Sequence, residues 1–331
     1  MAHVAPTPRD VLWRDGCAQL YRFRRPESVR PAAAMPVLVV PSMINRWYVV
    51  DLRAGASMVE GLLAGGLDLH CLDWGIARDE DRYLTWDDVV ARLARAVRFV
   101  KRVTGAEKVG LVGYCMGATL AGIYAALHPD DVGAFINLAG PFDFSQGGLL
   151  RTMVDPRWFD AHTVAEAGNV SPSQMQSGFV ALRPSSQLAK WVGFLDRAHN
   201  ASSRDAFDAL ETWAGDNIPF PGAAYDTYIT DLYQRNALVR GLHHVAGRRV
   251  DLANIRCPVL TVAADRDTIC PLPAARALHE SCGSADKELF VVPGGHVGAV
   301  VGSRAPKVLY PAMRDWLKAR LATDSTRTPC N

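Results

Sequence analysis

The sequence predicts an α/β fold, in which a mostly parallel sheet is covered by helices on both faces. Short continuous apolar runs alternate with helical segments along much of the chain, which is typical of this fold class. Several runs, such as 36–41, are apolar at successive positions and not at every second one, as in strands that are buried on both faces of a sheet. The alternation stops after residue 141 and resumes near residue 251, which indicates an insertion.

The first half of the chain supplies most of the expected sheet. Apolar residues at helical spacing predict a helix over 86–103 that ends before Gly105, and an alanine-rich stretch predicts another over 118–127, stopped by His128-Pro129. Prolines or glycines bound several of the apolar runs, and the runs themselves predict strands. These expected strands span residues 36–41, 67–74, 108–112 and 133–138.

Two more strands are expected at 258–263 and 287–292, with a helix near 274–281 between them. Between residues 142 and 250 the strand patterns fade, and helical segments rich in Trp, Met and Phe replace them. We therefore expect a core formed by residues 36–141 and 251–321, and a helical cap, 142–250, over the carboxyl edge of the sheet. Extra helices packed elsewhere are the alternative. Residues 1–35 are expected to be a short N-terminal segment, frayed over 1–9, and 322–331 a disordered tail.

Composition narrows the class of protein. The chain of 331 residues is 49% hydrophobic and 21% charged, with a net charge of +2 and interspersed signs, so no nucleic-acid partner is expected. The N-terminus lacks a signal-peptide core and no apolar run could span a bilayer, which predicts a cytoplasmic protein without a transmembrane segment. The seven cysteines are scattered without a Cys-x-x-Cys pair, so neither disulfides nor a metal site is expected.

One cysteine has an unusual setting. Gly113-Tyr114-Cys115-Met116-Gly117 lies between an apolar strand and an alanine-rich helix, and has the Gly-x-nucleophile-x-Gly pattern of the α/β-hydrolase fold with Cys in place of Ser. A strand that turns sharply into a helix exposes its middle residue, and the helix N-terminus favours a thiolate there. Cys115 is therefore the candidate nucleophile. A buried structural cysteine in a tight turn is the alternative.

An acid and a histidine follow in the order that this fold requires. Asp267 lies in the loop after the strand 258–263, and His296 lies in a glycine-rich loop after the strand 287–292. Asp265 competes for the acid role, but the acid normally stands farther into this loop. The other histidines do not follow a strand inside a glycine-rich loop. His243 and His244 are expected in a surface turn.

The oxyanion hole is expected to use two backbone N–H groups. Met116, directly after the nucleophile, supplies one. The loop after the first predicted strand supplies the other, from Ile44 or its neighbour Met43. A thiolate exchanges acyl groups readily with thioesters, because the attacking and leaving groups have similar basicity. This chemistry points to a CoA thioester as substrate and requires no cofactor.

With these residues the chain resembles a known family, the polyhydroxyalkanoate synthases, and in particular the class III catalytic subunit. The similarity extends from about residue 7 to 320, and the 29-residue interval from Asp267 to His296 fits the family. It rests on the elbow, on the loops of Asp267 and His296, and on several local motifs. These are residues 8–11 (PRDV), 44–52 (INRWYVVDL), 72–75 (LDWG), 143–144 (DF), 168–172 (GNVSP) and 247–252 (GRRVDL).

The resemblance implies an acyltransferase that polymerises (R)-3-hydroxyacyl-CoA, typically 3-hydroxybutyryl-CoA, into polyhydroxyalkanoate with release of CoA. Cys115 would carry the growing chain as a thioester and His296 would take the thiol proton. Asp267 would orient His296 or help to activate the 3-hydroxyl of the incoming substrate. Trp213 would stand in the Trp-bearing segment of the cap, for packing or for function.

The resemblance also implies partners and a location. A homodimer, a second helical class III subunit, and a place at cytoplasmic polyhydroxyalkanoate granules are expected. Two features depart from the family: Ala118 stands where glycine is usual, and about 35 residues precede the first predicted strand, which is short even for class III.

Two other functions remain open. The same residues could serve a polyhydroxyalkanoate depolymerase or a thioesterase, in which water attacks the acyl-enzyme in place of a hydroxyacyl group. A degenerate, non-catalytic homologue at the granule is the other alternative.

Overall fold

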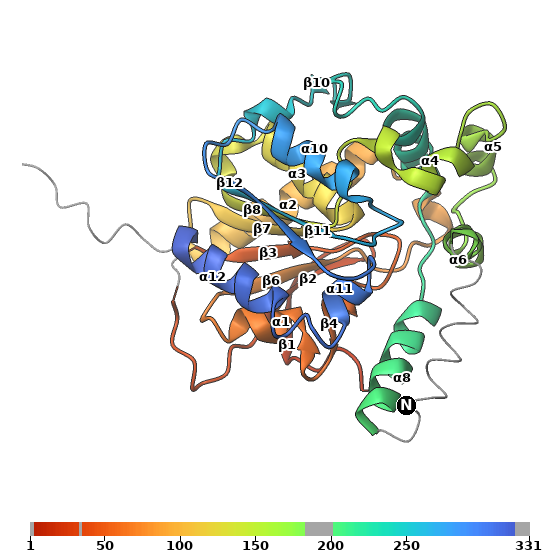
Figure 1. Cartoon of the computed structure of the whole chain (residues 1–331). Coiled ribbons are helices and arrows are strands. Elements are labelled where there is room, and N and C mark those ends of the chain that lie inside the picture. The colour runs from red at the N-terminus through yellow and green to blue at the C-terminus, as the bar shows by residue number, and fades with distance from the viewer. Residues whose placement is uncertain (1–2, 33–34, 183–200, 322–331) are drawn as a thin grey trace, which may run out of the picture.

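An eight-stranded sheet lies at the centre of the computed structural model, which describes residues 3–32, 35–182 and 201–321 (Figure 1). The strand order is β1-β2-β6-β3-β7-β8-β11-β12. The last six strands of this order pair in parallel, whereas β1 and β2 run antiparallel to their neighbours. The strands are β1 (Arg9–Asp15), β2 (Ala18–Phe23), β3 (Val37–Val40), β6 (Leu69–Asp73), β7 (Val109–Tyr114), β8 (Val132–Leu138), β11 (Val259–Ala264) and β12 (Lys287–Val292).

The predicted α/β fold and its six strands are confirmed, with shifts of one or two residues at most boundaries. Every residue of β3, β7 and β11 is buried, which explains their continuous apolar runs. Helices cover both faces (Figure 1). One face carries α2 (Trp86–Thr104), α3 (Met116–Leu127) and α10 (Leu272–Ser281), and the other carries α1 (Met58–Leu63), α11 (Gly298–Val301) and α12 (Leu309–Leu321).

The N-terminal region has more structure than the sequence predicted. Residues 9–23 form the hairpin of β1 and β2, which extends the sheet beyond β6. The expected fraying over residues 1–9 is wrong for the described part. Thr7 is buried, and its hydroxyl donates to Asp51 Oδ1 at 2.7 Å. The hairpin was missed because β1 is an edge strand whose residues are half-buried or exposed, so its sequence carries no continuous apolar run.

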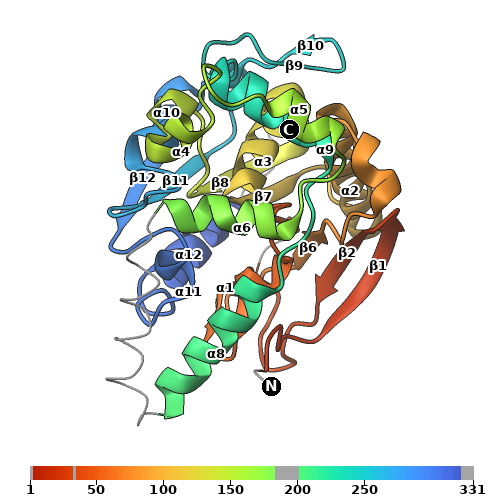
Figure 2. The ribbon, with the colours of Figure 1, turned by 90° about the vertical axis from the view of Figure 1, so that its right-hand side faces the viewer.

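Helices fill most of the described chain between β8 and β11. They are α4 (Gly148–Met153), α5 (Ala161–Glu166), α6 (Pro172–Ala181), α8 (Ala201–Gly215), α9 (Gly222–Thr227) and a π-helix, η5 (Tyr228–Gln234). In Figure 2 α6 crosses in front of the sheet, and α8 extends away from it. Trp191 and Phe194, which fall within the expected cap, lie outside the described residues, as does the segment 322–331.

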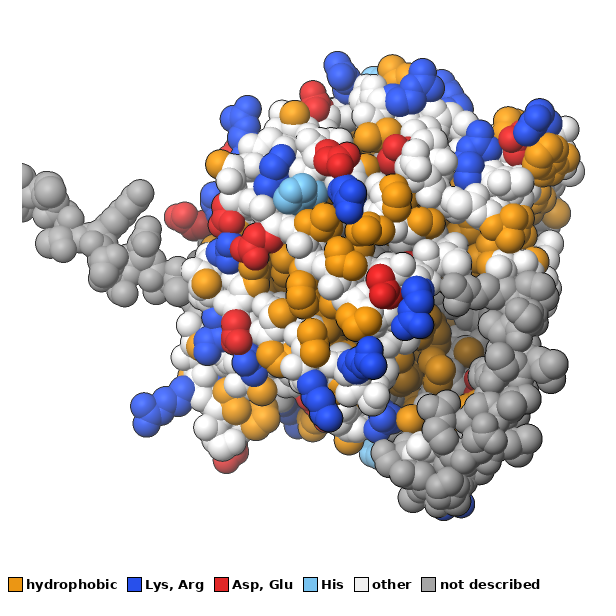
Figure 3. All heavy atoms as spheres, viewed as in Figure 1, with side chains coloured by type: hydrophobic (Ala, Val, Ile, Leu, Met, Phe, Trp, Pro, Cys, Tyr) orange, Lys and Arg blue, Asp and Glu red, His pale blue; other side chains and the backbone are white. Residues whose placement is uncertain are grey.

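Two minor hairpins lie outside the main sheet, β4–β5 (Asp51–Arg53 and Ala56–Ser57) and β9–β10 (His244–Val245 and Arg248–Arg249). Charged side chains of both signs are interspersed over the face that Figure 3 shows, as the sequence predicted. Within the described ranges, the helices are all too short or too polar to cross a membrane.

Candidate active site

The turn from β7 into α3 holds Cys115 in a strained backbone conformation, with φ 57° and ψ −129°. The two flanking glycines are required by close packing. A Cβ atom on Gly117 would lie 2.0 Å from the carbonyl oxygen of Val40, and one on Gly113 would lie 2.2 Å from the Cα atom of Ala118. Both obstacles are backbone atoms, which cannot move aside without disturbing the sheet or the helix. The elbow expected from the sequence is therefore present.

His296 and Asp267 form a buried pair beside this elbow. The Nδ1 atom of His296 lies 2.7 Å from Oδ2 of Asp267. The other carboxylate oxygen of Asp267 accepts the backbone N–H groups of Ile269 at 2.8 Å and Cys270 at 2.9 Å. The imidazole ring stacks on Tyr114, with ring centroids 5.4 Å apart and planes inclined by 26°. The bond to Asp267 and the stack on Tyr114 therefore fix the orientation of His296.

The competing carboxylate, Asp265, lies elsewhere. Its side chain is 47% exposed, and its Oδ1 atom accepts the backbone N–H of Gly294 at 2.7 Å. That bond ties the loop after β11 to the glycine-rich loop that carries His296. Of these two acids, Asp267 is the one that the structure brings to the histidine, and Asp265 holds the two loops together.

Two other histidines differ in their surroundings from His296. The expectation of a surface turn is wrong for His243, which is fully buried with Nδ1 at 3.4 Å from Oδ2 of Asp231. His244, its neighbour, is exposed and lies in β9. His243 is buried against Asp231 of the π-helix that precedes it. The local sequence does not reveal this contact.

The charge of His296 follows from its neighbours. Burial by itself lowers the pKa of this imidazole, but the negative charges of Cys115 and Asp267 outweigh burial and raise the pKa to about 10. Beside a Cys115 thiolate, His296 therefore holds its proton through neutral pH. The Nε2 atom is buried and makes no hydrogen bond to any residue in the described part of the chain. It is the free end of the imidazole, because Nδ1 is bonded to Asp267.

We expect nuclear magnetic resonance to show His296 titrating near pH 10, well above the ordinary histidine value of about 6.5. Since Asp267 and Cys115 each raise the pKa, Asp267→Asn and Cys115→Ala should each lower it. His128 is an internal reference, because burial lowers its pKa below 6.5. A His296 titration at or below 6.5 in the unmodified chain would contradict this charge assignment.

The two N–H groups expected to form the oxyanion hole differ in whether they already have a hydrogen-bond acceptor. Met116 is the first residue of α3, so its N–H group has no acceptor within the helix. The N–H of Ile44 instead donates to the side-chain oxygen of Ser42 at 3.2 Å. A substrate oxyanion would have to replace this oxygen, which needs only a rotation of the Ser42 side chain.

The loop that carries Ile44 is braced by the end of α8. Trp213 is buried, and its indole N–H donates to the carbonyl oxygen of Arg46 at 2.9 Å. Next to it, the hydroxyl of Tyr48 donates to Asp216 at 2.8 Å. Trp213 therefore holds the backbone of the loop that carries Ile44 in place.

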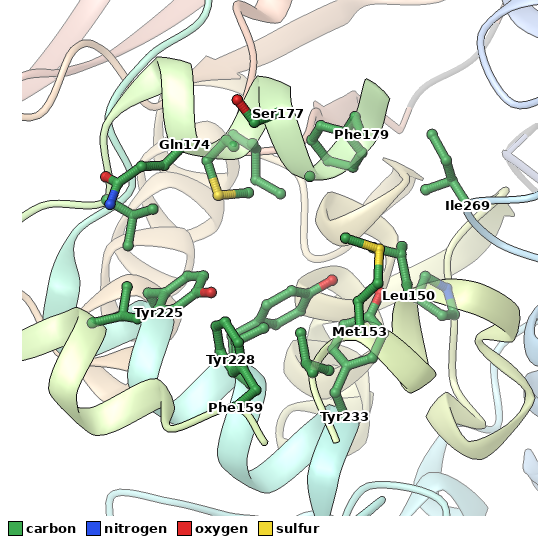
Figure 4. Close-up of a pocket in the computed structure, with 18 of the residues that line it drawn as sticks. Leu150, Met153, Phe159, Gln174, Ser177, Phe179, Tyr225, Tyr228, Tyr233 and Ile269 are labelled. Atoms are coloured by element: carbon green, nitrogen blue, oxygen red, sulfur yellow. The ribbon is translucent and has the colours of Figure 1, made fainter. Parts of the chain in front are cut away.

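Cys115 opens into a cavity of about 750 Å³ between the sheet and the helical insertion (Figure 4). The lining is mainly apolar and comes from α4, α5, α6, α9, the π-helix and the loop after β11. Met153, Trp158, Met175 and Phe179, which belong to the Trp-, Met- and Phe-rich segments of the expected cap, all line it. Sequence reasoning missed other lining residues, whose only signal was their apolar or aromatic character. They include Leu150, Phe159, Tyr225, Tyr228, Tyr233 and Cys270.

Comparison with known proteins identifies the family. A family model described as "alpha/beta hydrolase fold" matches residues 36–303, and one described as "Poly-beta-hydroxybutyrate polymerase (PhaC) N-terminus" matches residues 2–62. The protein named poly(3-hydroxyalkanoate) polymerase subunit PhaC in Allochromatium vinosum is 33% identical over 317 residues, which cover 95% of this chain and 89% of that relative. The chain belongs to the PhaC family. The resemblance seen in the sequence is therefore confirmed.

Two other PhaC subunits support the same assignment. The one from Synechocystis is 31% identical over 330 residues, covering 96% of this chain and 86% of its own length. That from Haloferax mediterranei is also 31% identical, with 98% and 67% covered. Among solved structures, a hydrolase from Pseudomonas aeruginosa has a TM-score of 0.57 at 15% identity, covering 93% of this chain and 98% of its own. At that identity the likeness supports the fold alone.

Ala118, which the sequence analysis noted as a departure from the family pattern, fits its position. Its methyl group is fully buried and faces two glycines. A Cβ atom on Gly140 would lie 2.4 Å from that of Ala118, and one on Gly113 would lie 2.9 Å from it. The absence of side chains at these two positions makes room for the methyl group, so the elbow keeps its geometry.

Proposed function

We propose that the chain is the catalytic subunit of a polyhydroxyalkanoate synthase. It acts as an acyltransferase that polymerises (R)-3-hydroxyacyl-CoA, with 3-hydroxybutyryl-CoA as the expected substrate, and releases CoA. The observation that carries the proposal is the position of Cys115, between the buried His296–Asp267 pair and a large apolar cavity. An apolar cavity suits an acyl or polyester chain, and a cysteine suits exchange between thioesters.

In the first step, the Cys115 thiolate attacks the thioester carbonyl of the substrate. The N–H of Met116 stabilises the oxyanion, and that of Ile44 joins it once Ser42 has turned away. The carbon–sulfur bond to CoA then breaks, and the proton on His296 Nε2 passes to the departing CoA sulfur. The products are CoA, a thioester on Cys115 and a neutral His296.

In the second step, neutral His296 accepts the proton of a 3-hydroxyl group on another 3-hydroxyacyl-CoA. The hydroxyl oxygen attacks the Cys115 thioester, and Cys115 leaves as a thiolate beside a protonated His296. The chain, now one unit longer and held as a thioester of the new CoA, can return to Cys115 by attack of the thiolate on that thioester, which releases the CoA. Each cycle restores the starting charges of the pair.

The contacts of Asp267 support one of its two expected roles. One carboxylate oxygen faces His296, the other accepts two backbone N–H groups, and the side chain has no exposed area. Both oxygens of Asp267 already accept hydrogen bonds and its side chain is closed off from solvent, so a substrate hydroxyl has no open approach to the carboxylate. We therefore propose that Asp267 orients His296 and that His296 alone handles the substrate proton.

The test incubates the purified chain with 3-hydroxybutyryl-CoA, with and without a helical class III partner subunit, and follows CoA release together with the product. Polymer is the expected product. Free 3-hydroxybutyrate would replace the proposal by a hydrolase, in which water attacks the thioester. If no CoA is released by the folded chain in either mixture, the proposed synthase activity is wrong.

The proposed function includes the partners and the location that the resemblance implies. We propose a homodimer, association with a second helical subunit, and work at the surface of polyhydroxyalkanoate granules. Trp158 and Leu149, in the insertion, are 58% and 47% exposed and are suited to an apolar surface. Light scattering of the purified chain tests the dimer, and co-sedimentation with polyhydroxybutyrate particles tests granule binding. A monomer, or a chain that stays in the supernatant, would contradict the respective part.

A further inference from the structure

A π-helix, η5, follows α9 in the insertion and carries two tyrosines, Tyr228 and Tyr233. Its turn is wider than that of an α-helix: the N–H of Arg235 donates to the carbonyl oxygen of Thr230, five residues earlier, at 3.0 Å. In an α-helix, residues five apart lie about 140° apart around the axis, since each residue advances by about 100°. The π-helix instead brings residues five apart toward one face. Isolated π turns occur frequently at functional sites.

The two tyrosines lie side by side in the structure. Their ring centroids are 5.4 Å apart with planes inclined by 77°. Phe144 packs edge-on against both rings, at 4.8 Å from Tyr233 and 5.9 Å from Tyr228. Trp86 stacks on Tyr228 at 5.5 Å. These contacts hold the rings in one orientation, so the hydroxyl groups are positioned before any substrate arrives.

Both tyrosines line the cavity into which Cys115 opens. In Figure 4 the hydroxyl group of Tyr228 points into the open space. Burial is the main cause that raises the pKa of both phenols, and nearby charges raise it further: those of Tyr233 and Cys115 for Tyr228, and that of Cys115 for Tyr233. Because these pKa values lie above the ordinary tyrosine value, both hydroxyls stay protonated near neutral pH. They can donate hydrogen bonds but cannot act as bases.

The apolar wall of the cavity indicates what these two hydroxyl groups can bind. Most of the cavity wall is apolar, formed by side chains such as Leu150, Val154 and Phe159. An oxygen atom of the acyl chain that is buried in such a wall without a hydrogen bond would cost free energy. An acyl group with no oxygen beyond its thioester carbonyl needs no such hydrogen bond. The phenols would then have no hydrogen-bond partner on the substrate.

We propose that Tyr228 and Tyr233 are positioning residues that hold an oxygen atom of the acyl chain attached to Cys115. They would thereby select acyl groups with a hydroxyl or ester oxygen near the thioester over unsubstituted acyl groups. This inference rests on the proposed function and adds to it a reason for substrate selection. A site built to hydrogen-bond a substrate oxygen discriminates strongly against the analogue that lacks it.

The test compares two substrates, 3-hydroxybutyryl-CoA and butyryl-CoA, which differ by one hydroxyl group. First-turnover CoA release gives the second-order rate constant for acylation of Cys115 by each. In the unmodified chain the hydroxylated substrate should react faster. Tyr228→Phe and Tyr233→Phe should each lower the rate constant for 3-hydroxybutyryl-CoA by about tenfold and leave that for butyryl-CoA nearly unchanged. The double variant should bring the ratio close to one.

Tyr124→Phe is the matched control. Tyr124 is also buried, but its hydroxyl donates to Asp131 at the far end of α3, so its removal should leave the ratio unchanged. Both substrates are measured on the same preparation, so any unfolded fraction cancels in the ratio. An unchanged ratio in both Tyr228→Phe and Tyr233→Phe, or an equal fall for both substrates, would overturn the inference while the proposed function stands. An unmodified chain that releases CoA from neither substrate would overturn both.

Discussion

Cys115→Ser should lower the rate of CoA release from 3-hydroxybutyryl-CoA by at least ~10³-fold, which corresponds to about 4 kcal/mol of transition-state stabilisation. Serine fits the elbow, because it is no larger than cysteine and the flanking glycines keep their close contacts. The loss comes from chemistry. A serine hydroxyl is not ionised near neutral pH, and a chain attached to it would be an ester, which exchanges with CoA far less readily than a thioester.

The matched control is Cys257→Ser. Cys257 is partly buried like Cys115, but it lies before β11, away from the cavity, and burial raises its pKa to about 12. Its replacement should leave CoA release within about twofold, and mass spectrometry should find the hydroxybutyryl adduct on Cys115 alone. Full activity of Cys115→Ser, or an adduct on another cysteine, would show that Cys115 is not the nucleophile.

Most of the sheet could be predicted from the sequence because its strands are buried on both faces. The apolar runs that became β3, β7, β8 and β11 need no knowledge of their neighbours. The hairpin of β1 and β2 was missed for the opposite reason. Its outer strand has an exposed edge, and β2 is recognisable as a strand only from its pairing with β6.

In the candidate site, too, some features could be predicted from the sequence and others could not. Cys115, Asp267 and His296 each stand just past a strand in a recognisable loop, so the topology of the fold brings them together. The positioning tyrosines depend on a π turn, and the bond between Ile44 and Ser42 depends on one side-chain rotamer. Neither feature leaves a pattern in the sequence. The cavity likewise combines residues from distant segments, so only the apolar character of its wall could be expected.

Asp267→Asn should lower the overall rate of polymerisation by up to about 10⁴-fold, the loss known for the corresponding change in a Ser-His-Asp enzyme. The amide loses the charge that helps to keep His296 protonated, and its NH₂ group can hold the imidazole in the wrong tautomer. The two expected roles of Asp267 predict different steps for this loss. Acylation of Cys115 is read from the first release of CoA, and elongation from the later turnovers.

If Asp267 only orients His296, both steps should fall, because the same imidazole gives a proton to CoA in the first step and takes one from the 3-hydroxyl in the second. If Asp267 itself activated the hydroxyl, acylation would stay near normal and only elongation would fall. The structure favours a fall in both steps, since both carboxylate oxygens are already occupied, one by His296 and one by two backbone N–H groups. Asp265→Asn is the comparison: its carboxylate joins two loops without touching His296, so it should reduce both rates only slightly.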